Sequence, residues 1–225
     1  MLPEAISASV ATLLNDIHTW PLPVDTYMAD GTAVAIYLDH RVSLDIDLFT
    51  DKEFYCGPII SSIGQKYVTT VTNPSEKNTL IAMVANIRFS LFNYPYPLLK
   101  PLVSKPECNI RLASPGDIAA MKVVAITQRG SAKDFIDLHA LIRAFGLPLD
   151  YLIVQVQKKY GVSEDYGYQT KRSLVYFDDA LRSLGDVTVI RNGKEVRLDK
   201  REWSKVEEFF KKLVYSPMPS KRGKN

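Results

Sequence analysis

Residues 29–49 read ADGTAVAIYLDHRVSLDIDLF, and this stretch decides the fold that the sequence predicts. In its last part, residues 44–49, apolar residues alternate with aspartates, and this pattern predicts a short strand. Side chains two apart on a strand point the same way, so Asp45 and Asp47 are expected on one face. The other face is expected to be filled by Leu44, Ile46 and Leu48. Two parallel carboxylates repel each other, and a divalent cation such as Mg²⁺ between them would relieve that repulsion.

A short apolar helix is predicted upstream, at residues 32–38, directly after Gly31. A glycine beside a small hydroxyl residue, Thr32, suits phosphate binding because the backbone can approach closely and helix N-terminal amides favour anions. Together with Asp45 and Asp47, this pair describes a site for a metal–nucleotide complex. The alternative is an edge strand whose two aspartates are merely solvated.

Two helices are predicted downstream, at residues 114–128 and 132–146, the first with Ser114 as its cap. Lys122 lies beside the apolar stripe of the first helix, and Asp134 and Asp137 lie at or near the buried face of the second. Buried charges need partners. Either these residues form a structural network with neighbouring cations, or Lys122 neutralises phosphate charge while one aspartate completes the site.

The order of predicted elements gives an α+β fold, a mixed sheet with flanking helices followed by a mainly helical C-terminal half. Residues 1–112 are expected to form the α/β core, and residues 113–225 the helical region that completes the site. Further helices are expected at 3–18, 55–66, 149–160, 169–183 and 200–213. A further strand is expected at 66–72, a strand region folded as a hairpin at 79–94, a small hairpin at 187–197, and disorder at 216–225.

The composition is that of an ordinary globular protein, with 46% hydrophobic and 24% charged residues among 225. The N-terminus lacks the basic region of a signal peptide, and no uncharged apolar run approaches the roughly 20 residues of a membrane span, so a cytoplasmic location without a membrane partner is expected. Cys56 and Cys108 are expected to be free thiols. Residues 171–225 hold 14 Lys and Arg against 8 Asp and Glu, a mild indication of a polyanionic partner.

Residues 29–49 resemble the first motif of the AbiEii/AbiGii-type toxins, which belong to the minimal-nucleotidyltransferase-like group. The segment from Met121 to Leu138 resembles the second motif of the same family. The resemblance implies a nucleotidyltransferase fold and transfer of a nucleoside monophosphate from an NTP to an RNA acceptor such as tRNA, or to a protein. It also implies a toxin of a toxin–antitoxin or phage-defence system, with an antitoxin protein as a partner.

The resemblance further implies roles for individual residues. Mg²⁺ or Mn²⁺ would be held by Asp45 and Asp47, and the nucleotide phosphates would lie near Gly31 and Thr32. The nucleotide would be flanked by Arg41 and Ser43, and Lys122 and Asp137 would occupy the catalytic positions of the second motif. Because Ser90 stands on the strand where many nucleotidyltransferases carry an acid, Asp134 is a candidate third carboxylate and Asp137 is the alternative; otherwise the metal site is weakened.

Two other functions remain open at this point. The chain could be a catalytically inactive nucleotide- or RNA-binding module, since Asp30 stands where the family has the first glycine of a pair. Alternatively, the chain could have a purely protein-binding role, in which the charged pocket contacts an antitoxin. The histidines are scattered without metal-ligand spacing, although His40 could touch a nucleotide and His139 is expected to pack or lie at the surface.

Overall fold

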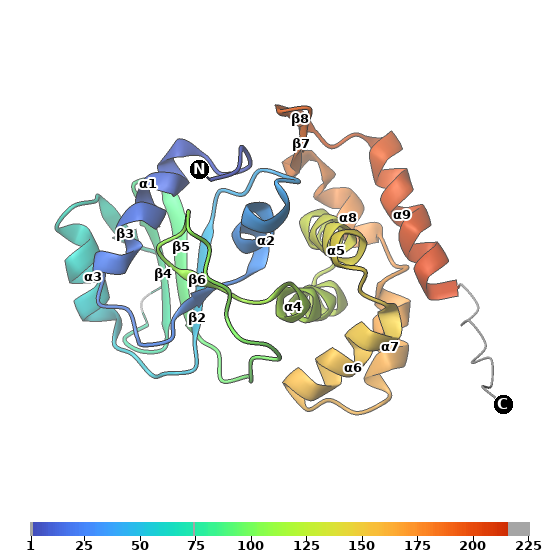
Figure 1. The fold of residues 1–225 in the computed structure, drawn as a ribbon, viewed down its shortest axis with the longest axis horizontal. Coiled ribbons are helices and arrows are strands. Elements are labelled where there is room, and N and C mark those ends of the chain that lie inside the picture. Colours follow the sequence, from blue (N-terminus) through green and yellow to red (C-terminus); the bar gives the residue numbers. More distant parts are fainter. Residues whose placement is uncertain (1, 74, 216–225) are drawn as a thin grey trace.

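A mixed sheet lies on one side of the molecule and a group of helices on the other in the computed structural model, which describes residues 2–73 and 75–215 (Figure 1). The six-stranded sheet has the order β3-β4-β5-β2-β1-β6. Its strands are β1 (Tyr27–Met28), β2 (Ile46–Thr50), β3 (Thr69–Val71), β4 (Thr79–Val84), β5 (Ile87–Asn93) and β6 (Arg111–Leu112). The N-terminal part also holds α1 (Ala8–Asp16), η1 (Ile17–Thr19), α2 (Asp30–Leu38) and α3 (Cys56–Gly64).

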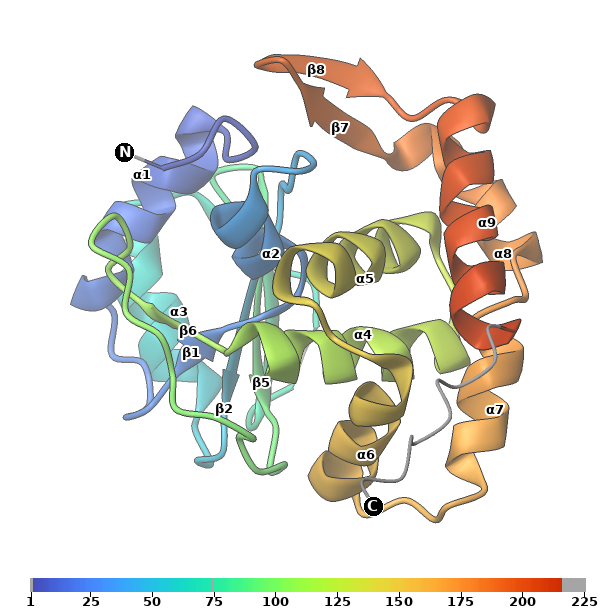
Figure 2. The same cartoon turned by 45° about the vertical axis from the view of Figure 1, so that its right-hand side comes forward.

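The C-terminal part of the chain is mainly helical. It consists of α4 (Pro115–Gln128), α5 (Ala132–Phe145), α6 (Leu149–Tyr160), α7 (Tyr166–Ser173), α8 (Asp178–Arg182), η2 (Leu184–Asp186), the hairpin β7 (Thr188–Arg191) and β8 (Lys194–Arg197), and α9 (Lys200–Tyr215). In Figure 2, α4 and α5 lie next to α2, and α9 runs along the outer side of this group. The predicted fold class is therefore confirmed.

The register of β2 places the predicted acidic strand in the interior of the sheet. It pairs in parallel with β5 and antiparallel with β1, so it has neighbours on both sides. In the parallel ladder, Asp47 is the direct partner of Ser90. The alternative of an edge strand is thereby excluded, and Ser90 does stand beside the acidic pair.

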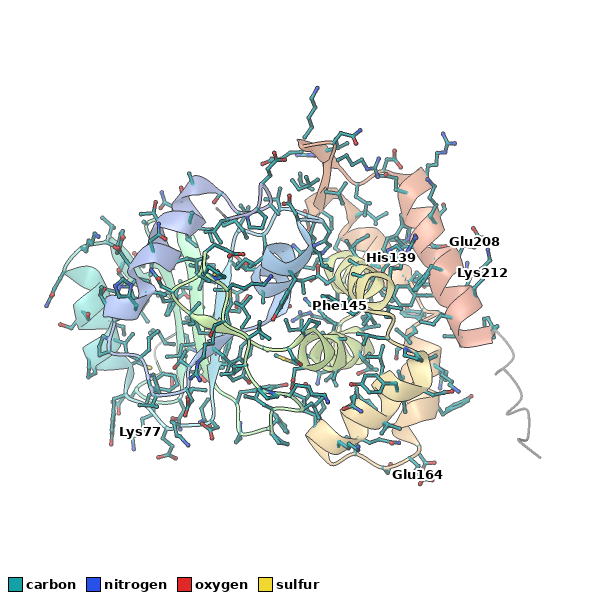
Figure 3. All side chains as sticks on the ribbon, in the orientation of Figure 1. Lys77, His139, Phe145, Glu164, Glu208 and Lys212 are labelled. Carbon is teal, nitrogen blue, oxygen red and sulfur yellow. The ribbon has the colours of Figure 1, made fainter. Side chains whose placement is uncertain are left out.

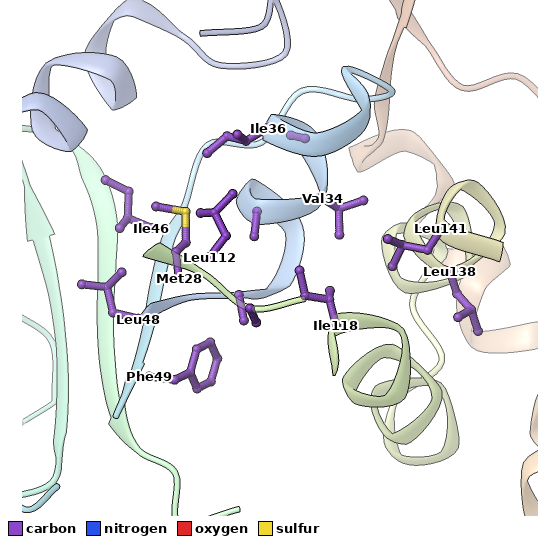
Figure 4. Packing of buried hydrophobic residues seen from close by; sticks show 14 of the residues in the cluster. Met28, Val34, Ile36, Ile46, Leu48, Phe49, Leu112, Ile118, Leu138 and Leu141 are labelled. Carbon is purple, nitrogen blue, oxygen red and sulfur yellow. The ribbon is translucent and has the colours of Figure 1, made fainter. Parts of the chain in front are cut away.

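One hydrophobic cluster extends from the sheet through α2 into the C-terminal helices. Figure 4 shows Met28 and Leu112 from the sheet close to α2, and Ile118 and Leu138 from α4 and α5 on the far side of that helix. Burying these side chains is the main force that fixes the helical half against the sheet. Helix α2 is thus held from both sides.

Local sequence signals explain where several elements begin and end. The Ser114 hydroxyl accepts a hydrogen bond from the Asp117 backbone N–H at 3.0 Å and caps α4. The β7–β8 hairpin turns at Asn192 and Gly193, whose φ angles of 47° and 71° are those of a type I′ turn. The predicted hairpin at 187–197 is confirmed, as are the helices at 114–128, 132–146 and 149–160 within one or two residues.

The predicted strand at 44–49 was wrong at its start. Strand β2 begins at Ile46, and Leu44 is 58% exposed instead of filling the apolar face. The reason is that the preceding backbone is tied elsewhere: the N–H of Val42 donates to the Thr188 carbonyl at 2.8 Å and that of Ser43 to the Ala5 carbonyl at 3.1 Å. The chain joins the sheet only after these bonds, so Asp45 lies just before the strand.

Two predicted helices also differ from the structure. Helix α1 covers only part of 3–18, because Ser7 caps it at its first turn. The predicted helix at 169–183 is divided into α7 and α8, and the break between them lets both Leu174 and Phe177 reach the core. Both cysteines are free, as predicted, whereas residues 216–225 lie outside the described part of the chain. No helix among the described residues is long and apolar enough to cross a membrane.

Candidate active site

The two aspartates of the first motif lie between two cavities. Both are half-buried, Asp45 directly before β2 and Asp47 within it. The α2 cavity, about 370 Å³, lies between α2 and the loop before α5 and is also lined by Gly31, Arg41 and Ser43. The β5 cavity, about 240 Å³, lies on the other side and is also lined by Arg88, Tyr94, Arg129 and Tyr160. The side chains that line both cavities include Asp30, Asp45, Asp47 and Lys133. The acidic pair is therefore accessible from two directions.

Negative charge accumulates around Asp47. Burial, followed by the charges of Asp30 and Asp45, raises the pKa of Asp47 to about 6. A cation next to these oxygens would favour the ionised form. No group of three or more His, Cys, Asp or Glu side chains that could hold a metal ion gathers within residues 2–73 and 75–215. The two carboxylates of Asp45 and Asp47 are the candidate ligands, and a pair of this kind suits Mg²⁺, since this ion commonly takes one or two carboxylates together with substrate phosphates and water.

Neutralising Asp47 should stabilise the metal-free protein. Because its folded pKa is raised, the folded state binds this proton more tightly than the unfolded chain, so the wild type loses stability as the pH rises from about 4 to about 6. In EDTA near pH 7.5, Asp47→Asn should raise the free energy of unfolding by about 1 to 3 kcal/mol. Urea unfolding at pH 7.5 and pH 4 checks this: the gain should be absent at pH 4, and Asp51→Asn, at a 58% exposed position, should change neither value. Equal stability of Asp47→Asn and wild type at pH 7.5 would contradict it.

Lys122 is the centre of a buried network of charges. It is 1% exposed, and its Nζ contacts the carboxylates of Asp30, Asp134 and Asp137, the last two at 3.1 and 2.8 Å. Burial alone would lower the pKa of Lys122, but the three carboxylates outweigh it and raise the pKa. The lysine therefore stays charged, and Asp30 links it to both cavities.

Asp137 joins this network to Arg41. Its Oδ1 and Oδ2 accept hydrogen bonds from Arg41 Nε and Nη2 at 2.6 and 2.8 Å, and His40 Nε2 lies 2.8 Å from Oδ1. Although burial would raise the pKa of Asp137, Arg41 and Lys122 hold it well below its usual value. Asp137 thus fixes the guanidinium of Arg41 at the wall of the α2 cavity without lining that cavity itself.

Asp134 is also fully engaged. It receives hydrogen bonds from Arg129 at 2.8 and 3.0 Å and from the Ser131 hydroxyl at 2.6 Å, besides Lys122. It is completely buried and lines neither cavity. Its role as a third carboxylate stays a prediction, and Asp30 is the additional carboxylate that faces the acidic pair.

Gly31 and Thr32 are buried under the residues that flank the site. A Cβ at Gly31 would lie 2.4 Å from Arg41 Nη2 and 3.2 Å from the Ser43 hydroxyl. The Thr32 hydroxyl donates to the Asp45 carbonyl and lies 2.8 Å from the Ser43 hydroxyl. The glycine therefore gives room to the guanidinium of Arg41, and Thr32 fixes the backbone that carries Asp45.

Gly31→Ala should be destabilising, although alanine is the better helix former. The added methyl must displace Arg41, which two hydrogen bonds hold on buried Asp137. We expect a loss of about 1 to 3 kcal/mol in the free energy of unfolding. Gly64→Ala is the matched control, because nothing lies within 4 Å of a Cβ there. It should be neutral or stabilising by up to about 1 kcal/mol in the same chemical denaturation experiment; equal effects at both positions would contradict this account.

Asp30 occupies a backbone conformation that favours glycine. Its φ of 62° lies in the left-handed region, which glycine adopts readily, and aspartate is one of the few other residues that tolerate it. Its carboxylate contacts Lys122 and lies 4.0 Å from Arg129. The negative charge is thus partly neutralised by two cations.

Sequence reasoning missed several residues of the two cavities, among them Arg88, Tyr160 and Asp186. Arg88 lies two positions before Ser90 on β5, so the period of a strand would have placed both on one face. Tyr160, from the end of α6, and Asp186, from η2, gave no signal, because only the packing of the helical half brings them to the site. Tyr94 and Tyr160 contact each other through their hydroxyls.

Comparisons with known proteins identify the family and the fold of this chain. A family model described as nucleotidyl transferase AbiEii toxin, type IV TA system, matches residues 68–214, a range that contains Lys122 but begins after Asp45 and Asp47. An uncharacterized protein of Aquifex aeolicus (strain VF5) is 42% identical over 193 residues, 84% of this chain and 86% of that protein. Among solved structures, the nucleotidyltransferase toxin MenT4 from Mycobacterium tuberculosis H37Rv has a similar fold, with a TM-score of 0.53 over 93% of this chain and 82% of that chain at 10% identity.

Proposed function

The chain belongs to the AbiEii family of nucleotidyl transferase toxins of type IV toxin–antitoxin systems, and from this membership we propose that it transfers a nucleoside monophosphate from an NTP to an RNA or protein acceptor. In this reaction an acceptor hydroxyl oxygen forms a bond to the α-phosphorus and releases its proton to water. The bond from the α-phosphorus to the oxygen that bridges to the β-phosphate breaks, and pyrophosphate leaves. The reaction would take place at Asp45 and Asp47. A cytoplasmic setting, where NTPs are abundant, is part of the proposal.

The observation that carries the proposal is that the acidic pair is shared by two cavities. A transfer between two substrates needs both reactants at the same charged centre. One cavity can take the NTP while the other admits the acceptor, and Asp45 and Asp47 lie where the two meet.

The α2 cavity is the proposed NTP site. Arg41 and Lys133 at its wall provide positive charge for phosphate oxygens. Asp45 and Asp47 would hold Mg²⁺ or Mn²⁺, which supplies charge compensation at the phosphates when bound. Asp137 would act indirectly, because it keeps Arg41 in one orientation, and Ser43 would contact the nucleotide from the same wall.

The β5 cavity is the proposed entrance for the acceptor. Arg88 and Arg129 lie there beside the carboxylates, and Tyr94 and Tyr160 form an aromatic wall. Cations next to aromatic rings suit a single-stranded nucleic acid, whose phosphates and bases they can contact together. This favours an RNA acceptor, such as tRNA, over a protein acceptor.

The proposal is tested by incubating the protein with Mg²⁺, each α-labelled NTP, total tRNA and a cell extract. We expect label on RNA, and label on protein would revise the acceptor while keeping the reaction. Tight NTP binding without transfer to any acceptor would favour an inactive nucleotide-binding module, a reading that the Asp30–Lys122 contact and Ser90 beside Asp47 support. No NTP binding at all would refute both functions.

A further inference from the structure

A buried ion pair joins α4 to α6 outside the two cavities of the candidate active site. Lys159 on α6 is 2% exposed and Asp117 on α4 is completely buried, and Lys159 Nζ lies 3.0 Å from Asp117 Oδ1. Neither side chain lines the α2 cavity or the β5 cavity. A buried ion pair is a costly way to join two helices, because apolar side chains of similar size often do so at least as well. Its further hydrogen bonds therefore indicate what else the pair holds.

The pair holds the backbone of residues 94–101, the irregular loop that follows β5. Lys159 Nζ donates to the Pro97 carbonyl at 2.9 Å. Asp117 accepts from two backbone N–H groups of the loop at 2.9 and 3.2 Å, besides the Ser114 hydroxyl that caps α4. Loops normally lie at the surface, where water can satisfy such backbone groups. Here a buried ion pair satisfies three of them, and it thereby fixes the loop against the helical half.

The same loop carries one side of the aromatic wall of the β5 cavity. Tyr94, at its start, and Tyr160, the last residue of α6, line that cavity and contact each other through their hydroxyls. The ring of Tyr96 lies against both, with centroids 4.8 Å apart in each case, and Lys159 Nζ lies 5.8 Å from the centroid of the Tyr94 ring. Figures 1 and 2 show the loop running from β5 toward α6, and in Figure 3 the labelled Glu164 marks the segment between α6 and α7. The ion pair thus connects the two sides of the wall.

We propose that Lys159 and Asp117 are positioning residues for the acceptor. This inference rests on the proposed function, in which the β5 cavity admits a single-stranded RNA. The pair holds Tyr94 and Tyr160 in the arrangement on which acceptor bases stack, so that binding does not first have to order the loop. Both charges are buried, and neither touches the acceptor or the NTP. Their removal should therefore weaken acceptor binding without affecting NTP binding in the α2 cavity.

The test measures the binding of the two substrates separately on the full chain. A short fluorescein-labelled single-stranded RNA is the acceptor probe, followed by fluorescence anisotropy. The α,β-methylene analogue of each NTP, with Mg²⁺, is the probe for the α2 cavity, followed by calorimetry. Lys159→Met keeps most of the apolar stem and removes the ammonium. It should weaken RNA binding by about 5- to 30-fold and leave binding of the NTP analogue unchanged within about twofold.

Two further variants separate positioning from a loss of stability. Lys159→Met leaves a buried carboxylate without its cation, so Asp117→Asn/Lys159→Met, which removes both charges, is measured beside it and should weaken RNA binding to a similar extent. Leu14→Ala is the control, because Leu14 is 1% exposed on α1 and lines neither cavity. This change also destabilises the core but should leave RNA binding unchanged. A circular dichroism spectrum of each variant verifies its fold.

A double-mutant cycle tests whether the ion pair acts through the aromatic wall. Tyr94→Leu removes one aromatic face and should itself weaken RNA binding. Lys159→Met should then weaken binding by no more than about twofold further, because the ring that the ammonium holds is already absent. A purely structural ion pair would give independent, additive effects at the two positions.

The proposal would be overturned by unchanged RNA binding in both Lys159→Met and the double charge variant, or by an equal loss in Leu14→Ala. Additive effects of Lys159→Met and Tyr94→Leu, or a wild type that does not bind the RNA, would also overturn it. None of these results refutes the proposed function, because α-label on a protein acceptor would keep the reaction. Conversely, RNA binding that depends on Lys159 in a chain that transfers no label would refute the reaction and keep the role of the ion pair in binding.

Discussion

The Asp137→Asn variant should lose about 3 to 5 kcal/mol of its free energy of unfolding, because it leaves two buried cations without their common anion. Asp137 is completely buried, with Arg41 bonded at 2.6 and 2.8 Å and Lys122 Nζ at 2.8 Å. An amide cannot compensate these charges, and its NH₂ group would face other donors. Equilibrium unfolding in urea at pH 7.5, followed by circular dichroism, measures the loss.

Asp179→Asn is the matched control for this change. Asp179 also forms an ion pair with an arginine, Arg182, at 3.3 Å, but the two side chains are 45% and 79% exposed. A pair in such a position contributes about 0 to 1 kcal/mol. A similar small effect at Asp137 would show that the buried network does not stabilise the fold.

The same network should make the free energy of unfolding depend on pH. Arg41 and Lys122 lower the pKa of Asp137, so its contribution is present above the unfolded pKa of about 4 and is lost as the pH falls through the lower folded value. The wild type should therefore destabilise steeply below pH 4. Asp137→Asn lacks this titration and should show a shallower decline over the same range.

The periodic features of this chain could be predicted from its sequence. The alternation at residues 44–49 indicated a strand, although β2 begins only at Ile46, and helical spacing placed Asp134 and Asp137 at or near a buried face. Both signals are local, because they depend on residues two to four positions apart. For the same reason the hairpin at Asn192 and Gly193 was found.

The contacts between distant segments could not be predicted in this way. Gly31 gives room to Arg41 because α5 brings Asp137 against α2, and no local pattern records that packing. The contact between Asp30 and Lys122 likewise joins residues 92 positions apart, and only the packing of α4 against α2 brings them together. Leu44 is exposed because Thr188, far along the chain, holds the preceding backbone.

The second large effect concerns activity. Asp45→Asn and Asp47→Asn, singly or together, should lower the proposed transfer by about a thousandfold or more, because each removes a charged oxygen from the centre between the two cavities. The fold should persist, since Asp47→Asn is expected to stabilise the metal-free protein. Initial rates at saturating NTP, together with a circular dichroism spectrum of each variant, provide the measurement.

Asp51→Asn is the control for these variants. Asp51 directly follows β2 and is exposed, so its replacement changes the net charge by the same amount without touching the two shared cavities. It should retain most of the activity. A loss at Asp51 as large as that at Asp45 would mean that general electrostatics, and not this acidic pair, determines the rate.

The central claim is that nucleotidyl transfer takes place at Asp45 and Asp47, and a comparison of α-labelled and γ-labelled NTP tests it most directly. With Mg²⁺ and RNA, the wild type should attach the α-label to the acceptor and release the γ-label as pyrophosphate, and the Asp45→Asn/Asp47→Asn variant should do neither. Transfer of the γ-label to the acceptor, or α-label transfer that the double variant retains, would contradict the account.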